Sequence, residues 1–265
     1  MCTGNVAENP VPYYRLIHKF RFLLASLNIE GILQEPTIHR RQERLSKIIG
    51  GLGLEDAYGA TIERVNVQGG DKSRLGVGAL MWITHAEQPL MAHELCYALA
   101  VELGFTDFNA GNIPSVMTLV SCCLGLITVD KEASTVRLIH FTLKKYLSAW
   151  PDIFSRPHSA IAEICLTYLN SRQVKALPAH YEYPPFLEYC SIYWGMHAKR
   201  KLSECARSLA LELLQEYDDH MSANCLTVNI SGEENESESS NFRFNGLHCA
   251  SFFGIAEVVS ALREM

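Results

Sequence analysis

Histidine and cysteine are the residue types of this chain best suited to metal binding or nucleophilic chemistry, and the sequence holds ten of the first and nine of the second. No C-x-x-C pair occurs, and no cysteines and histidines follow one another at the spacing of a zinc site. His85 and His93 lie eight residues apart across a predicted helix break. His158 lies near a proline, and neither His180 nor His197 has a ligand-type neighbour at metal-site spacing. We therefore predict no metal site.

Two motifs that would indicate an enzyme are absent from the sequence. There is no G-x-x-x-x-G-K-[ST] phosphate loop, so the chain lacks the amides, lysine and hydroxyl that hold a nucleoside triphosphate and its magnesium ion. There is also no G-x-S-x-G turn, which exposes the serine nucleophile of α/β hydrolases. We predict a non-enzymatic chain that uses no cofactor.

The cysteine pattern and the apolar segments favour the cytoplasm. The cysteine count is odd, only Cys122 and Cys123 are neighbours, and Met1 to Pro10 shows no basic region followed by an apolar run. We expect reduced, mostly buried thiols and no secretory signal. The longest apolar stretches, such as Val116 to Val129, are interrupted before they reach the roughly 20 apolar positions of a membrane span. We predict a cytoplasmic chain without membrane contact.

The net charge of −6 gives phosphate backbones no general attraction. The short basic clusters at His39 to Arg44 and Lys199 to Lys201 have acidic neighbours on predicted helices, and we interpret them as solvated helix faces. We predict no nucleic-acid partner.

Hydrophobic periodicity predicts a mainly α-helical fold whose first part is a set of three helices within residues 21–69, after an N-terminal tail at 1–20. These helices are expected at Phe20 to Leu33, Thr37 to Ile49 and Leu54 to Val67. The second is stopped by Gly50-Gly51, since glycines are common helix terminators.

Residues 70–150 have the element order of a winged helix. Three helices are expected at Asp71 to Ala86, Pro89 to Leu103 and Ile113 to Leu124, with Asp71 as the cap of the first. The β-branched runs Leu126 to Val129 and Thr135 to Ile139 predict a small β-hairpin, and Phe141 to Ala149 predicts a helix capped by Thr142. In a DNA-binding winged helix the third helix reads base edges, but here it has no lysine or arginine. We interpret it as a protein interface or core element.

A helical layer is expected at residues 151–228, with helices at Ser159 to Asn170, Pro185 to Lys199 and Leu202 to Tyr217. An acidic, serine-rich stretch predicts a flexible linker at 229–242, because it has too little apolar surface to offset the entropy of ordering. Six aromatic residues of the layer form either its core or a partner groove: Tyr181, Tyr183, Phe186, Tyr189, Tyr193 and Trp194.

Residues 243–265 fit the pattern of one ankyrin repeat. Leu247, His248 and Ala250 take the positions of the L-H-x-A signature. Gly254 ends the first helix, and the second helix contributes apolar Val258, Val259 and Leu262. One repeat cannot bury its apolar face without neighbours, so we expect this to be the first repeat of a truncated array.

Three other parts of the sequence resemble the region that follows the nucleotide-binding core of fungal-type NACHT-ankyrin proteins, which belong to the STAND group of signal-transducing ATPases. Phe22-Leu-Leu-Ala-Ser-Leu27, with Ala57-Tyr58 and Ile62-Glu-Arg64, is similar to the helical tail of the NACHT module. Trp82-Ile-Thr-His-Ala-Glu-Gln-Pro-Leu90, with Glu94-Leu95, Ala98-Leu-Ala-Val-Glu102 and Val136-Arg-Leu-Ile-His140, is similar to its winged helix, of the type found in GPI inositol-deacylase-like proteins. Pro185-Phe-Leu-Glu-Tyr189 with Tyr193-Trp-Gly-Met-His-Ala198 is similar to the helical segment before the repeats.

The resemblance implies roles for two histidines. A histidine at the position of His140 contacts the phosphate of bound ADP in related STAND proteins, and the alternative is a hydrogen bond to the cap of the next helix. His248 is implied to hydrogen-bond backbone across the turn between repeats. The resemblance also implies a regulatory scaffold of an NLR-like signalling protein, with protein partners at the winged helix and the ankyrin repeat. The alternatives are a remnant nucleotide-binding or GPI inositol-deacylase-like hydrolase protein, or an inactive fragment.

Overall fold

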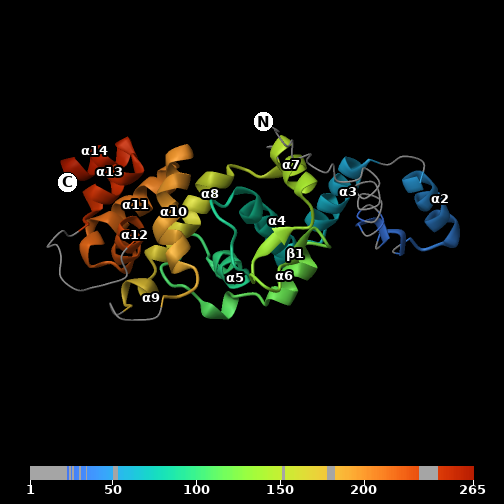
Figure 1. The fold of residues 1–265 in the computed structure, drawn as a ribbon, viewed down its shortest axis with the longest axis horizontal. Helices are drawn as coiled ribbons and strands as arrows, with labels where there is room; N and C mark the ends of the chain where they lie inside the picture. Colours follow the sequence, from blue (N-terminus) through green and yellow to red (C-terminus); the bar gives the residue numbers. More distant parts are fainter. Residues whose placement is uncertain are drawn as a thin grey trace, which may run out of the picture.

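A computed structural model describes residues 23, 25, 27–29, 31–33, 35–49, 53–150, 153–177, 183–232 and 244–265. Figure 1 shows an elongated arrangement, with α2 (Ile38–Ile49) near one end and the C-terminal helices at the other. The described part is mainly helical and contains one two-stranded antiparallel sheet, which confirms the predicted fold class. None of the helices in these ranges combines the length and the apolar character needed to cross a bilayer.

Helix α3 (Leu54–Val67) connects the N-terminal part to the rest of the chain. It buries Tyr58, Ile62 and Val65, as its periodicity predicts, and it packs against α4 (Gly70–His85). Gly76 of α4 permits this close approach, because an added Cβ would lie 2.7 Å from Val65 Cγ1 and 2.7 Å from the Cys122 carbonyl oxygen. The predicted tail at 1–20 lies outside the described residues, as does part of the first predicted helix.

The middle of the chain has the element order expected of a winged helix. After α4 come α5 (Ala92–Ala100), a 3-10 turn (Ala110–Asn112), α6 (Val116–Cys122), β1 (Ile127–Val129), β2 (Val136–Leu138) and α7 (Phe141–Ala149). The strands pair in antiparallel register, with Ile127 opposite Leu138 and Val129 opposite Val136. Buried Trp82, Leu95 and Leu119 supply side chains to the core between the three helices.

Several helix bounds of this segment differ from the sequence prediction: α5 ends at Ala100, not Leu103, and α6 is shorter than the predicted Ile113 to Leu124. Helix α5 begins at Ala92, not Pro89, because the Glu94 carboxylate accepts a hydrogen bond of 2.7 Å from the Met91 amide and so fixes the start there. Helix α4 begins at Gly70, and Asp71 lies in its first turn, not at its cap. Helix α7 is capped by His140, because its ring accepts a hydrogen bond from the Thr142 amide. Thr142 is therefore the second residue of the helix and not its cap.

The helical layer is larger than the sequence predicts. It contains α8 (Pro157–Leu169), α9 (Arg172–Lys175), α10 (Leu187–Arg200), α11 (Glu204–Gln215), a 3-10 turn (Tyr217–Asp219) and α12 (Met221–Ser231). Helix α10 packs between α8 and α12. The predicted linker therefore starts too early, since residues 229–231 belong to α12, which ends at Gly232 with a φ of 68°. The rest of the linker, 233–242, lies outside the described residues.

Most of the aromatic cluster predicted in this layer is core. Phe186, Tyr189 and Trp194 are fully buried, and the Trp82 ring lies edge-on to both Phe186 and Tyr189, at 5.6 Å between centroids in each case. These contacts join the helical layer to the winged-helix segment through one apolar core. Tyr183 is exposed, and Tyr181 lies outside the described residues.

The predicted ankyrin-like helix pair is present as α13 (Gly246–Phe253) and α14 (Ala256–Glu264). Ala250, Phe253 and Val258 are buried, while Leu247, Val259 and Leu262 are only partly covered or exposed. Gly254 ends α13 with a φ of 69°, as predicted. The pair packs on α10 and α11, where Gly246 lies against the Leu214 carbonyl group and Gly195 lies against the Phe253 ring. The helical layer therefore covers one apolar side of this helix pair.

Candidate functional site: the His140 groove and the Glu87 histidine cluster

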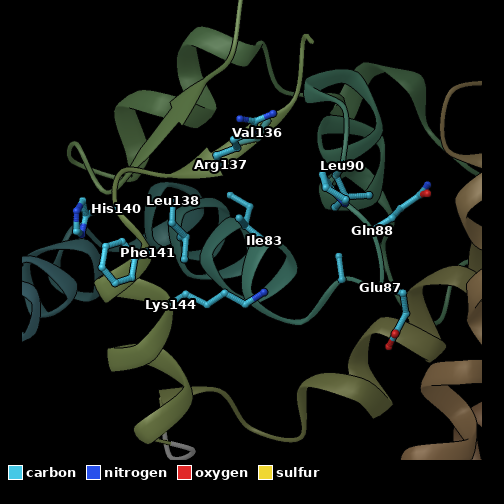
Figure 2. Close-up of a pocket in the computed structure, with 12 residues that line it drawn as sticks. Ile83, Glu87, Gln88, Leu90, Val136, Arg137, Leu138, His140, Phe141 and Lys144 are labelled. Atoms are coloured by element: carbon cyan, nitrogen blue, oxygen red, sulfur yellow. The ribbon is translucent and has the colours of Figure 1, made fainter. Parts of the chain in front are cut away.

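A groove of about 390 Å³ lies beside the β-hairpin, between the end of α4, the turn at 86–90, β2 and the start of α7 (Figure 2). Twelve residues line this His140 groove: Ile83, Ala86, Glu87, Gln88, Pro89, Leu90, Val136, Arg137, Leu138, His140, Phe141 and Lys144. Most of them are apolar. Arg137, His140 and Lys144 add basic groups from β2 and α7, whereas Glu87 lies at the opposite end in the view of Figure 2.

Arg137 is already paired, because its guanidinium lies 3.1 Å from the Asp130 carboxylate across the hairpin. The Asp130 carboxylate also accepts hydrogen bonds from the Glu132 and Ala133 amides, and these bonds hold its pKa below the ordinary value. The hairpin loop is thus held by its own polar contacts. Lys144 is the remaining cation of the groove wall, and its ammonium group lies toward the groove in Figure 2.

His140 acts as the N-terminal cap of α7. Its Nδ1 accepts a hydrogen bond from the Thr142 amide at 3.3 Å and lies 2.8 Å from the Thr142 hydroxyl. The same hydroxyl lies 2.8 Å from the phenol oxygen of Tyr58, so the cap is connected to α3. This is the hydrogen bond that the helix-cap interpretation of His140 requires. The contact with an ADP phosphate stays a prediction.

A second group of polar side chains lies behind the Glu87 end of the groove. His158 at the start of α8 and His197 on α10 face each other with their Nδ1 atoms 2.8 Å apart. Tyr189 lies on the other side of His197, with its hydroxyl 3.0 Å from His197 Nε2. We call Glu87, His158 and His197 the Glu87 cluster.

The hydrogen bonds around His197 fix where its proton lies. The Arg200 guanidinium can only donate, so His158 accepts at Nε2 at 3.1 Å and carries its proton on Nδ1. His158 then donates to Nδ1 of His197, and His197 donates from Nε2 to the Tyr189 hydroxyl oxygen. That oxygen also accepts from the Glu87 amide at 3.2 Å. A further proton on either ring would break one of these bonds, so the pair is built for two neutral imidazoles.

Electrostatics agrees with this assignment. Burial lowers the pKa of His197 to about 3, and burial and the nearby Arg200 guanidinium lower the pKa of His158. His85, whose ring lies edge-on to His158 at 5.4 Å, has a pKa lowered to about 4, mainly by burial. Near neutral pH all three imidazoles are uncharged, and the charges at the cluster are those of Glu87 and Arg200.

The Glu87 carboxylate lies 2.8 Å from the Arg200 guanidinium and 4.0 Å from His197 Nε2. One possible ligand atom from each of Glu87, His158 and His197 lies within 4.8 Å of the other two. The spacing argument therefore missed this cluster when it found no set of ligand-type residues around His158 and His197. The three residues come from distant parts of the sequence, and only the packing of α8 and α10 against the turn after α4 brings them together.

The other histidines singled out from the sequence do not join the cluster. His93 lies exposed on α5, and His180 falls outside the described residues. Asn245 caps the helix that contains His248: the His248 amide donates to the Asn245 side chain at 3.0 Å, and His248 Nδ1 accepts from the Asn245 amide at 3.2 Å. One sequence signal could have marked His197 as buried, because it lies two helical turns after buried Tyr189, on the same side of α10.

Comparison with known proteins finds one family model that matches part of the chain. Residues 63–165 match the family model described as GPI inositol-deacylase, winged helix domain. This segment is therefore similar to a winged helix domain of that type. The matched range extends beyond the predicted 70–150 at both ends, taking in the end of α3 and part of α8. No curated protein and no solved structure matches the chain.

Within the winged helix domain, the His140 groove lies between the helices and the hairpin, whereas the Glu87 cluster lies where the domain meets the helical layer. Glu87 and His158 belong to the matched residues, and His197 comes from α10 beyond them. The cluster therefore joins the domain to a part of the chain that the family model does not cover.

Proposed function

We propose that this chain is a non-catalytic scaffold that acts through protein contacts of its winged helix domain. The observation that carries the proposal is a set of large apolar side chains on the outer side of α7 and the adjoining strand. Phe141 is 57% exposed and Trp150 is 55% exposed, at the two ends of α7. Exposed aromatic groups of this size are typical of protein interfaces.

The surface around these two residues contains two hollows as well as apolar side chains. Phe141 lines the His140 groove, and Trp150 lines a second hollow of about 360 Å³ between α3 and α7, together with Leu54, Tyr58 and Tyr146. Lys144 and Lys145 lie between the two hollows on α7. We expect a protein partner with an apolar ridge and acidic groups at its rim. By the resemblance stated above, a nucleotide-binding domain of the NACHT type is the candidate partner.

Helix α6 argues against a nucleic-acid role for the domain. This helix reads VMTLVSC and carries no lysine or arginine. Leu119 and Cys122 are buried, and Met117 is 83% exposed. The helix therefore lacks the cationic and amide side chains that make the commonest specific contacts to base edges.

A buried hydroxyl also supports the non-catalytic part of the proposal. Ser222 Oγ lies 2.7 Å from Nδ1 of His220, which resembles a nucleophile with its base. However, Ser222 is fully buried, and His220 Nε2 lies 3.0 Å from the Leu169 carbonyl oxygen. No substrate can reach this hydroxyl, so we assign the pair to the N-terminus of α12.

The test is the mass of the complex that the full chain forms in cells that express it. Static light scattering on the native complex should give a mass above that of the chain alone. Phe141→Asp combined with Trp150→Asp should return it to the mass of the free chain, because buried charges oppose docking. Ile38→Asp is the matched control, since Ile38 is 73% exposed on α2 at the far end of the molecule (Figure 1). An unchanged complex in the double variant would contradict the proposal.

A second candidate function is nucleotide sensing at the His140 groove. The observation that favours it is the basic lining from Arg137, His140 and Lys144. A thermal-shift titration of the full chain with ADP and ATP tests it, because a ligand that binds the folded state raises the unfolding temperature. Stabilisation that disappears in His140→Ala would support this second function. If neither nucleotide raises the unfolding temperature, protein binding remains the proposed role of the groove.

A further inference from the structure

The Glu87 cluster collects three groups of the kind that bind divalent metals. Glu87 lies in the turn after α4, His158 lies in the first turn of α8, and His197 lies on α10. Possible ligand atoms of all three lie within 4.8 Å of one another. Two imidazoles and one carboxylate form a donor set suited to zinc and similar transition metals.

The cluster already binds a positively charged group, the Arg200 guanidinium. Nη1 of Arg200 lies 2.8 Å from the Glu87 carboxylate and 3.1 Å from Nε2 of His158, so one cationic nitrogen touches two members of the cluster. The Glu87 side chain is only 13% exposed, whereas that of Arg200 is 49% exposed. The carboxylate is therefore fixed within the protein, while the arginine side chain can move out into solvent.

We propose that Glu87, His158 and His197 form a binding site for a divalent transition-metal ion of the zinc class, in exchange with the Arg200 guanidinium. The ion takes the place of the cationic nitrogen beside Glu87 and His158, and Arg200 moves toward solvent. It takes one lone pair from each imidazole, so the hydrogen bond between His158 and His197 opens when the ion binds. The half-exposed position of Arg200 provides the route by which the ion enters.

The protonation states of the two histidines favour binding. The 2.8 Å hydrogen bond between their Nδ1 atoms needs one ring to donate and the other to accept, so each neutral ring keeps one lone pair for the ion. The Glu87 carboxylate offsets one of the two charges of the ion.

The position of the site gives the ion a structural consequence. Glu87 and His158 lie within the matched winged helix domain, and His197 lies in the helical layer. An ion held by all three residues ties the turn at 86–90 and the start of α8 to α10. This inference does not depend on the proposed protein partner, because the groups involved lie at the inner end of the groove, away from Phe141 and Trp150.

The experiment is a titration of the metal-free, reduced full chain with Zn²⁺, followed by thermal unfolding and by isothermal calorimetry. We expect one zinc ion per chain and a rise in the unfolding temperature. Glu87→Gln and His158→Ala should each weaken binding by about tenfold or more, as expected when one ligand of a site is lost. Co²⁺ in place of Zn²⁺ should give a visible absorption band that the same substitutions remove.

Arg200→Met supplies the decisive variant, because it removes the competing cation without removing a ligand. We expect it to tighten zinc binding by about threefold to tenfold, since the ion no longer has to displace a paired guanidinium. This gain of affinity cannot come from a misfolded variant, so the test does not depend on the stability of the ligand substitutions.

Two controls distinguish the site from other zinc-binding groups. Cys205 is exposed, so Cys205→Ser tests whether that thiol holds the ion, and His93→Ala tests an exposed histidine outside the cluster. Neither change should alter the affinity. The proposal is overturned if the chain binds no zinc, if His158→Ala binds as tightly as the unmodified chain, or if binding disappears with Cys205→Ser. It is also overturned if Arg200→Met leaves the affinity unchanged.

Discussion

His140 and His197 are both hydrogen-bonded histidines of one chain, but they stabilise very different parts of it. His140 is partly exposed at the edge of a groove, and the partners of its Nδ1 are the amide and hydroxyl of Thr142, two residues away. His197 is fully buried, and its partners Tyr189 and His158 lie 8 and 39 residues away. His140 caps the start of a helix through neighbouring residues, and His197 connects two parts of the fold.

The difference shows which kind of role a sequence can reveal. A cap depends on neighbours in the sequence, so the motif His140-Phe-Thr142 is visible without a structure. A cluster assembled from a turn and two helices leaves no pattern in the spacing of its residues. The histidine with the clearest sequence signal is therefore the one whose loss should cost the least stability.

The substitution expected to reduce stability most is the one that removes the His197 side chain. His197→Ala removes two hydrogen bonds, leaves Nδ1 of His158 without its acceptor and opens a cavity in a fully buried position. We expect a loss of about 3 kcal/mol in the free energy of unfolding, measured by denaturant titration. His93→Ala is the matched control on an exposed helix position and should change stability by less than about 0.5 kcal/mol. A loss of under about 1 kcal/mol in His197→Ala would show that the cluster does not join the two parts as described.

Acid should reduce stability through the same cluster. The folded-state pKa values of His85 and His197 are lowered from 6.5 to about 4 and about 3, so below pH 6.5 the unfolded chain binds more protons than the folded chain. Stability is then complete above pH 6.5 and falls as the pH drops toward 4, by about 2 kcal/mol or more. His197→Gln removes one of these protonation sites, so its unfolding free energy should depend less steeply on pH. Equal slopes for both proteins would assign the pH effect to other groups.

His220 tests the effect of burial on such a cap. It caps α12 with the same local hydrogen-bond pattern as His140, but its side chain is buried. Its Nδ1 accepts from the Ser222 amide at 3.1 Å, and its Nε2 lies 3.0 Å from the Leu169 carbonyl oxygen, which therefore accepts a hydrogen bond from it. His220→Ala should cost about 2 kcal/mol, since it removes a cap and leaves that carbonyl group without its donor. If it costs no more than His140→Ala, then burial is not what separates the two caps.

The smallest expected effect is that of His140 itself. His140→Ala removes one capping hydrogen bond at a partly exposed helix start, for which we expect a loss of about 0.5 to 1 kcal/mol in chemical denaturation. His140→Asn retains a capping side chain and should recover most of that loss. A much larger effect of His140→Ala would mean that the relay through Thr142 to Tyr58 carries more of the packing between α3 and α7 than the distances indicate.

The fold was predictable where neighbouring residues determine it. The periodicity of α3, the hairpin formed by β1 and β2, and the α13–α14 pair with Gly254 between them all follow from short-range patterns. Helix α12 was missed because its sequence, MSANCLTVNIS, contains many polar and β-branched residues, and its start depends on the buried contacts of His220. The start of α5 was misplaced because the bond between Glu94 and the Met91 amide outweighs the preference of Pro89 for a first turn.

The candidate site was predictable only in part, for the same reason. The sequence indicated His140 and the apolar character of α6, which are local properties. It gave no indication that Glu87, His158 and His197 meet, since their meeting depends on how α8 and α10 pack. The stripe of Tyr189, Tyr193 and His197 on one side of α10 could have marked that histidine as buried, but not its partners.

The most direct test of the central claim, that the winged helix domain works by binding protein at the α7 surface, is site-specific photo-crosslinking in cells that express the full chain. A photoreactive residue placed at Phe141 should crosslink to one discrete protein, because that side chain lies 57% exposed beside the groove. The same group at Ile38, on the distant helix α2, should give no such product (Figure 1). Equal labelling from both positions, or none from Phe141, would contradict the account.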